Sequence, residues 1–176
     1  MPAAEAPTPR PLPAQASGER ALPGPHLPAR ALLEFAIYGP DLDVLERFYR
    51  ELFGLELIAR AEHRLVALRC GHSALLLFDP SVTRQPGPIP HHGAEGAGHL
   101  AFIIEPDERP GWRERLRQHG IEIEREIEWQ DGGSSIYFRD PAGNSVELAP
   151  PTIWGGIGRR LLDSLPGPLT TEATRP

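Results

Sequence analysis

Residues with metal-binding side chains stand at matched positions of a short sequence unit that occurs twice in the chain. The aligned stretches are Leu33-Glu34-Phe35-Ala36-Ile37 with Gly98-His99-Leu100-Ala101-Phe102, and Gly71-His72-Ser73-Ala74-Leu75-Leu76 with Gly143-Asn144-Ser145-Val146-Glu147-Leu148. This alignment matches Glu34 with His99 and Leu75 with Glu147. If the two copies pack about a pseudo-twofold axis, four strand positions converge, and three of them offer an imidazole or a carboxylate. Glu34, His99 and Glu147 therefore predict a three-ligand metal site with open coordination positions.

The elements that must position these residues follow from the periodicity of the apolar side chains. In the first copy we expect a strand over 32–38, a helix between Asp41 and Gly54, and strands over 55–61, 64–70 and 73–78. In the second copy we expect a strand over 99–104, a helix from Asp107 to Gly120, and strands over 121–127, 135–139 and 145–149. Residues 140–144 form the turn before the last strand. Each copy is thus a βαβββ module.

Alternation along the strands assigns each side chain to a face. Glu34, His99 and Glu147 all fall on the face that points away from the predicted helices. Two modules side by side would curl this face into a cup, and carboxylates inside it need a partner such as a cation. We therefore predict an α+β fold, with two tandem βαβββ modules forming an open cup of mixed β-sheet and helices on the outside.

The domain organisation follows from composition. Residues 1–30 are rich in proline without apolar periodicity, which predicts a disordered leader, and residues 31–151 form a single domain. Within the domain we expect module one over 32–79, a linker over 80–97 and module two over 98–150. The C-terminal tail, 152–176, has one amphipathic stretch over 157–165 that predicts a short helix. We expect His91 and His92 in the linker to be solvated, with a role as lid or acid/base as the alternative.

Composition excludes several classes of function. A net charge of −6 over 176 residues, without basic clusters, argues against binding to nucleic acid or anionic membranes. The 18 basic residues are all arginines, which excludes lysine Schiff-base chemistry and the phosphate-binding loop of nucleotide hydrolases. The single Cys70 cannot form an intramolecular disulfide, and we find neither a secretory signal nor a membrane-spanning apolar run. These features predict a cytoplasmic protein.

Four motifs in the right order and spacing resemble those of one superfamily. They are Glu34-Phe-Ala-Ile-Tyr-Gly-Pro-Asp-Leu, Arg47-Phe-Tyr-Arg-Glu-Leu-Phe-Gly-Leu, Gly98-His-Leu-Ala-Phe and Ile136-Tyr-Phe-Arg-Asp-Pro-Ala-Gly-Asn-Ser-Val-Glu147-Leu. The stretch from Leu32 to about Pro151 is similar to the vicinal oxygen chelate (VOC) superfamily, which contains glyoxalase I, extradiol dioxygenases, fosfomycin-resistance enzymes and bleomycin-resistance proteins. The resemblance covers neither tail.

The resemblance implies roles for individual positions. His99 and Glu147 match metal ligands of the second module, and Glu34 falls where many members have histidine or glutamine. Leu75 falls where glyoxalase I has another carboxylate, which favours the three-ligand arrangement of dioxygenases and fosfomycin enzymes. Tyr137 aligns with a tyrosine that hydrogen-bonds substrate, so it is our catalytic candidate. The absence of lysine argues against a glutathione-transferring fosfomycin enzyme.

The ligand set suits a divalent metal ion, namely Mn²⁺, Fe²⁺, Ni²⁺ or Zn²⁺, and also allows Mg²⁺. The metal would chelate two neighbouring oxygens of a small substrate, with Tyr38, Arg69 and Arg139 as substrate-binding candidates. This predicts a lyase, isomerase, thiol transferase or dioxygenase. The alternatives are a metal-free protein that sequesters a drug or metabolite, and a cup that serves only dimerisation. Related two-module chains commonly form homodimers, and in many of them each cup takes one module from each subunit. The resemblance then implies a homodimer in which Glu34 and His99 of one site come from different subunits.

Overall fold

A computed structural model describes residues 29, 31–130, 132–155 and 158. All described helices and strands belong to the second of two compact units of the chain, Leu32–Pro176. Nearly all of the predicted leader (1–30) and of the predicted tail helix (157–165) lies outside the described residues. Within the described part, no helix is long and apolar enough to cross a membrane.

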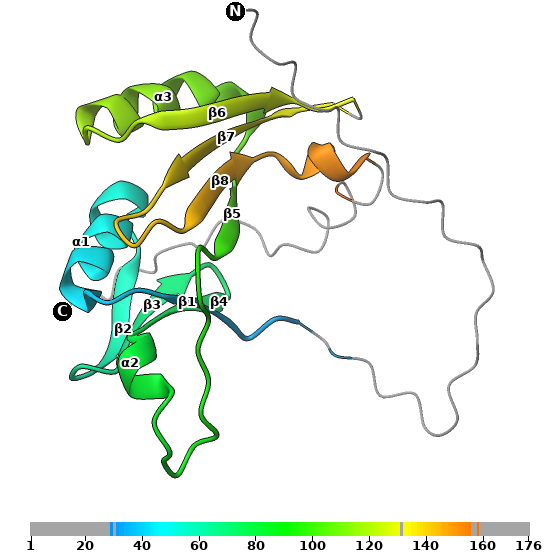
Figure 1. Ribbon diagram of the computed structural model, residues 1–176. Helices are drawn as coiled ribbons and strands as arrows, with labels where there is room; N and C mark the ends of the chain where they lie inside the picture. Colours follow the sequence, from blue (N-terminus) through cyan, green and yellow to red (C-terminus); the bar gives the residue numbers. More distant parts are fainter. Residues whose placement is uncertain (1–28, 30, 131, 156–157, 159–176) are drawn as a thin grey trace, which may run out of the picture. The chain divides into compact units, whose positions relative to one another are not determined.

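The first module has the predicted βαβββ order and then a short extra helix (Figure 1). Its elements are β1 (Glu34–Tyr38), α1 (Leu42–Phe53), β2 (Glu56–Ala61), β3 (Leu65–Cys70), β4 (Ser73–Phe78) and α2 (Pro80–Thr83). The Asp41 carboxylate caps α1 by accepting hydrogen bonds from the next turn, and Gly54 ends it in the left-handed conformation, with φ of 68°. The sheet order is β1-β4-β3-β2, with β1 and β4 parallel.

The second module repeats this architecture. Its elements are β5 (His99–Ile103), the 3₁₀ turn η1 (Pro106–Glu108), α3 (Arg109–Gln118), β6 (Ile123–Glu128), β7 (Ser134–Arg139), β8 (Ser145–Ala149) and the 3₁₀ turn η2 (Pro151–Trp154). The sheet order is β5-β8-β7-β6, again with the first and last strands of the module parallel. Two four-stranded mixed sheets with few helices confirm the predicted α+β fold class.

Strand register corrects one detail of the internal repeat. The paired residues nearest the predicted ligands are Glu34 with Ala74, Ala36 with Leu76, His99 with Ser145, and Ala101 with Glu147. The first-module equivalent of Glu147 is therefore Leu76, so the sequence-based match with Leu75 is wrong by one position. Because strand side chains alternate, a slip of one residue changes the face. Leu75 is fully buried in the main core, whereas Leu76 packs with Ala67 and Phe78 in a separate cluster.

One hydrophobic core receives the helix-bearing faces of both sheets. Fully buried Leu45, Tyr49 and Leu52 of α1 belong to the same cluster as buried residues of both sheets. The rings of Phe53, at the end of α1, and Phe102, on β5, stack with centroids 4.0 Å apart. Such aromatic contacts contribute about 1 kcal/mol beyond the burial of their area. The helix of module one thus packs against the sheet of module two, and the helix-free faces lie away from this shared core.

Polar contacts also join the modules at the turn between β7 and β8, which lies beside α1 in Figure 1. The buried Tyr49 hydroxyl donates a hydrogen bond of 2.9 Å to Asp140 at the start of this turn. Burial and the neighbouring Asp140 carboxylate raise the pKa of Tyr49, which keeps the hydroxyl protonated. At Gly39, an added Cβ would lie 2.6 Å from the Leu45 side chain and 2.7 Å from that of Ala142. Only glycine fits where the modules approach this closely.

Candidate metal centre

His99 and Glu147 come together on the helix-free face of the second sheet. The Nε2 atom of His99 lies 3.4 Å from Oε2 of Glu147. On its other side, Nδ1 of His99 lies 3.2 Å from the Ser145 carbonyl oxygen, to which it donates in the Nδ1–H tautomer. In this tautomer the lone pair of Nε2 is free and lies beside the carboxylate. A backbone carbonyl that fixes the second nitrogen is the usual support of a metal-binding histidine.

The separation of these two atoms fits a shared cation. Imidazole nitrogen and carboxylate oxygen bind divalent metals at about 2.1 Å, so two ligands at a tetrahedral angle lie roughly 3.4 Å apart. The observed Nε2 to Oε2 distance of 3.4 Å has this value. It is also longer than the ordinary range of a direct hydrogen bond. The two residues therefore fit a divalent metal ion as an adjacent ligand pair.

The Glu147 carboxylate is held in place by a chain of hydrogen bonds on the same sheet. Glu147 is 5% exposed, and its Oε1 atom accepts a hydrogen bond of 2.5 Å from the Ser135 hydroxyl. Nε1 of Trp129 in turn donates to the Ser135 oxygen at 2.7 Å. The other oxygen, Oε2, is the one beside His99. One oxygen is thus anchored while the other is available as a ligand.

Tyr137 completes this cluster on the second sheet. It pairs with Glu147 across β7 and β8, and its ring stacks against that of His99 with centroids 6.4 Å apart. Burial and the neighbouring Glu147 carboxylate raise the pKa of Tyr137 to about 12. The side chain is therefore a neutral hydroxyl near pH 7, and it can donate a hydrogen bond to a substrate oxygen.

Glu34, the third predicted ligand, does not join this cluster within the chain. Across the described residues, no group of three or more histidine, cysteine, aspartate or glutamate side chains could hold a metal ion. Glu34 is exposed on the helix-free face of the first sheet. The apolar cluster on this face, Ala67, Leu76 and Phe78, contains no residue of the second sheet, which carries His99 and Glu147. One chain thus presents two partial sites, a single carboxylate on one sheet and an imidazole–carboxylate pair on the other.

The predicted substrate-binding arginines occupy equivalent places in the two modules. Arg69 pairs with Ala74, the strand partner of Glu34, and its Nε lies 3.2 Å from Glu56. Arg139 pairs with Ser145, the strand partner of His99, and its guanidinium is bound at both ends by Glu124. Both arginines therefore share a sheet face with the predicted ligands, two strands away from them, but each is already engaged by a glutamate of the outer strand.

Tyr38 lies on the same face as Glu34 and has a partner that the sequence did not reveal. Its hydroxyl shares a hydrogen bond of 2.8 Å with Nδ1 of His92, in the linker. The His92 ring packs edge-on against Phe78, with centroids 4.6 Å apart. The expectation that His92 is a solvated loop residue is wrong, since the ring is half-buried on this face. His91 is exposed, as expected.

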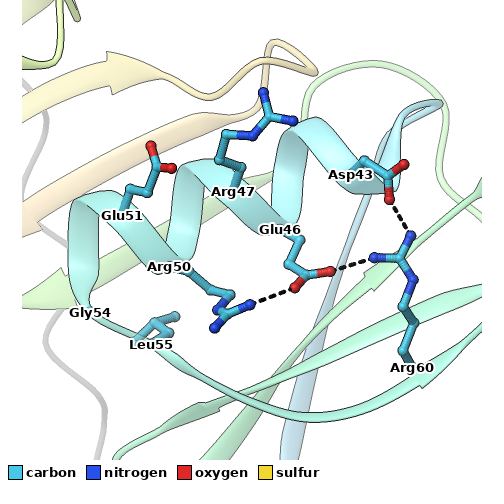
Figure 2. A pocket seen from close by; sticks show the side chains of 8 residues that line it. All are labelled: Asp43, Glu46, Arg47, Arg50, Glu51, Gly54, Leu55 and Arg60. Atoms are coloured by element: carbon cyan, nitrogen blue, oxygen red, sulfur yellow. Dashed lines mark hydrogen bonds and ion pairs between the residues drawn. The ribbon is translucent and has the colours of Figure 1, made fainter.

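A surface hollow with a volume of about 760 Å³ lies elsewhere, along α1 and β2. Figure 2 shows its centre, where the nearly buried Glu46 carboxylate receives hydrogen bonds from Arg50 and Arg60. Arg60 also binds Asp43. These charges neutralise one another, and none of the predicted site residues lines the hollow. We interpret it as a solvated ion-pair network that fastens β2 to α1.

Sequence reasoning missed the two residues that support Glu147. Ser135 lies two positions before Tyr137 on β7, so strand alternation places it on the same face and offered a usable signal. Trp129 follows the end of β6, and no local pattern connects it with Ser135. Its indole reaches Ser135 only because the β6–β7 connection folds back, with the Trp129 amide donating to the Gly133 carbonyl.

Comparison with known proteins agrees with this architecture. The sequence model of the Glyoxalase/Bleomycin resistance protein/Dioxygenase superfamily matches residues 31–148. The metallothiol transferase FosB of Bacillus licheniformis is 27% identical over 109 residues, which are 61% of this chain and 67% of FosB. A crystal structure of lactoylglutathione lyase from Agrobacterium tumefaciens is 43% identical and superposes with a TM-score of 0.70, over 73% of this chain and 98% of that one.

A more distant structure shows the fold alone. The glyoxalase/bleomycin resistance protein/dioxygenase from Nocardioides is 23% identical, with a TM-score of 0.59 over 71% of this chain and 85% of that one. The family match covers well over half of the chain and includes both βαβββ modules. The chain therefore belongs to the Glyoxalase/Bleomycin resistance protein/Dioxygenase superfamily, the vicinal oxygen chelate proteins.

Proposed function

We propose that this protein is a divalent-metal-dependent enzyme that acts on a small oxygenated substrate. The observation that carries the proposal is the His99–Glu147 pair, with ligand atoms 3.4 Å apart and an anchored, buried carboxylate. A buried carboxylate is costly unless it is paired, and a cation beside Oε2 would supply the partner. The relatives named metallothiol transferase and lactoylglutathione lyase support a metal-dependent reaction of lyase or transferase type.

We propose that Glu34 completes the site from the second subunit of a homodimer. In one chain the two helix-bearing faces meet, so the helix-free faces are left for another partner. Exposed Ile58, beside the Glu34 face, and exposed Ile103, on the His99 face, give both surfaces apolar area to bury. A twofold axis that brings the Glu34 face onto the His99 face creates two identical sites, each with three protein ligands.

The roles of the residues follow from their chemistry. A divalent cation held by this set would act as a Lewis acid toward two neighbouring oxygens of the substrate. Tyr137 would donate a hydrogen bond to one of these oxygens, because its raised pKa of about 12 keeps it protonated. Leu76 stands at the first-module position equivalent to Glu147, so this chain offers no fourth carboxylate there. An open coordination position remains for the substrate.

Metal content tests the ligand set. The measurement is metal per subunit, by plasma mass spectrometry, after reconstitution with Mn²⁺, Fe²⁺, Ni²⁺ and Zn²⁺. We expect near-stoichiometric metal in the wild type and a large loss in His99→Ala, Glu147→Gln and Glu34→Gln, with the fold retained by circular dichroism. A wild type that takes up none of these ions would contradict the proposal and favour a metal-free binding protein.

Mixing of variant subunits tests the shared site. A dimer of one His99→Ala chain and one Glu34→Gln chain contains one complete site, because each chain supplies the ligand that the other lacks. After unfolding and joint refolding, random pairing should restore about a quarter of the wild-type metal. The matched control is His99→Ala mixed with Glu147→Gln, in which both changes fall in the same module and no site is restored. Equal recovery in both mixtures would refute the shared site.

A further inference from the structure

A second feature of the Glu34 face is a cavity of about 670 Å³. Its floor is apolar and is formed by side chains of β1, β3 and β4, including Ala36, Leu76 and Phe78. Glu34 lines one part of the cavity, and Arg64 and His92 line another. An apolar floor with a few polar groups at its margins is typical of small-molecule sites.

The polar groups of the cavity lie near opposite ends of β1. Glu34 begins the strand and Tyr38, the hydrogen-bond partner of His92, ends it. Their Cα atoms are four steps apart along the strand, a distance of about 13 Å. Arg64 lies at the Tyr38 end, since it precedes Leu65, which pairs with Phe78, the strand neighbour of Tyr38. The cavity therefore has an acidic end and a basic end.

The linker holds His92 in place at the basic end. The His92 backbone amide donates a hydrogen bond of 3.0 Å to the Thr83 carbonyl, and the ring is fixed by Tyr38 and Phe78. Beyond His92, the Arg84 guanidinium donates to the Ala94 carbonyl at 2.9 Å. These contacts attach the linker on both sides of the imidazole. His92 is thus a positioned group of the cavity wall.

Arg64 supplies a charge at the same end. Its guanidinium forms no ion pair with any carboxylate of the described residues, in contrast to Arg69 and Arg139. Glu34 lies at the far end of the strand, so it does not compensate this charge locally. Among the described residues this arginine has no acidic partner, and it lines the same cavity as His92, so it has the chemistry to bind a carboxylate.

We propose that Arg64, Tyr38 and His92 form an anion-binding subsite for a substrate with an apolar body and a carboxylate. The carboxylate would bind at the basic end and the apolar body would lie over Leu76 and Ala36. The opposite end of the substrate would offer the chelating oxygens near Glu34. This last step rests on the proposed metal site. The subsite itself is independent of the metal.

The Tyr38–His92 pair adapts this subsite to its ligand. When Nδ1 of His92 carries the hydrogen, it donates to the Tyr38 oxygen, and the Tyr38 hydroxyl is then free to donate to a carboxylate. When Tyr38 donates to Nδ1 instead, the hydrogen of the imidazole is on Nε2. Either arrangement leaves one donor for the ligand, in addition to the guanidinium of Arg64.

The test is a titration of the metal-free, chelator-treated protein with 4-phenylbutyrate, followed by ¹H–¹⁵N NMR. We expect shifts at the amides of Tyr38 and His92. Affinity should fall at least tenfold in Arg64→Gln, since it removes a charged donor to the ligand, and by a smaller factor in Tyr38→Phe, because Nε2–H of His92 remains as a donor. The uncharged analogue 4-phenylbutanamide should bind at least tenfold more weakly than the acid. Arg117→Gln, on the exposed face of α3, is the matched control and should not change the affinity.

Three outcomes would overturn the proposal: no binding of 4-phenylbutyrate to the wild type, equal affinity for acid and amide, or unchanged affinity in Arg64→Gln. Because the titration is made without metal, its result is separate from that of the metal measurements. If the protein binds the carboxylate but takes up no metal, the subsite is supported and the proposed metal-dependent enzyme is contradicted. Metal uptake without carboxylate binding would contradict the subsite alone.

Discussion

Asn144→Ala should weaken both the fold and the proposed metal site, because one side chain supports both. The Asn144 amide is 2% exposed and makes three hydrogen bonds. Its oxygen accepts from the Gly98 amide at 2.8 Å, which fixes the backbone directly before His99. Its nitrogen donates to the Tyr38 carbonyl at 3.2 Å and to the Asp140 carboxylate at 2.8 Å. The residue thus connects the end of β1, the β7–β8 turn and the start of β5.

The size of the effect follows from these contacts. Each hydrogen bond contributes about 1 kcal/mol net, and somewhat more when the acceptor is charged, so we expect a loss of about 3 kcal/mol in the free energy of unfolding. For a domain of this size, that loss corresponds to a fall in Tm of about 6 to 12 °C. Removing a group that supports a metal ligand lowers metal affinity by about 10- to 100-fold.

Tyr49→Phe separates the two effects. It deletes the hydrogen bond to Asp140 but leaves the contact between Asn144 and Gly98 intact. We expect a loss of about 1.5 kcal/mol in stability with metal affinity nearly unchanged. The assays are thermal unfolding of the metal-free protein and competition for Zn²⁺ with a coloured chelator. A shift in Tm under 2 °C for Asn144→Ala, or equal metal affinity in the two variants, would refute the bridging role.

Three further predictions concern the modules and the site. Arg115→Ala should lower the free energy of unfolding by about 1 to 2 kcal/mol, because the Arg115 guanidinium donates to the Leu52 carbonyl at the end of α1 at 2.6 Å. Measured by urea unfolding, Arg115→Gln should recover only part of this loss. Trp129→Phe should weaken Zn²⁺ binding about tenfold without unfolding the protein, since Glu147 loses outer support; unchanged affinity in the chelator competition would contradict this. The phenolate absorbance of Tyr137, measured as the wild-type spectrum minus that of Tyr137→Phe, should titrate near pH 12. In a Glu147→Gln background it should titrate at a lower pH, but still above the ordinary range of tyrosine, because burial continues to raise the pKa. Because the pKa of Tyr137 is raised by folding, its stabilising contribution is complete below pH 10 and is lost as the pH rises through about 12, so the wild type should lose more stability than Tyr137→Phe over this range.

Local patterns in the sequence were sufficient for the modules. Asp41 and Gly54 mark the ends of α1 because one caps backbone amides and the other adopts a positive φ, and both signals act within a few residues. Alternation placed Glu147 on the helix-free face correctly because its neighbours Val146 and Leu148 are apolar on a strand that is buried on the other side. The extra helix α2 was missed, since its four residues lie in a segment whose proline content indicated a loop.

The repeat alignment failed where turns differ in length. Aligning the two stretches without a gap matched Leu75 with Glu147, whereas the register places Leu76 there. Register depends on pairing between strands, which a comparison of sequence letters does not measure. The fourth ligand position is still occupied by an apolar side chain, as predicted, because both residues are leucines.

Which faces meet within one chain depends on contacts far apart in sequence. Phe53 ends α1 of module one and Phe102 lies on β5 of module two, and the stacking of their rings at 4.0 Å joins the helix-bearing sides of both modules in one core. Once the helix-bearing faces share a core, Glu34 and the His99–Glu147 pair must lie on different sides of it. A three-ligand site then requires either a second chain or a different packing of the two modules. A different packing would expose the fully buried Tyr49 and break its hydrogen bond to Asp140. The energetic cost of that exposure is the physical reason to expect the third ligand from a partner subunit.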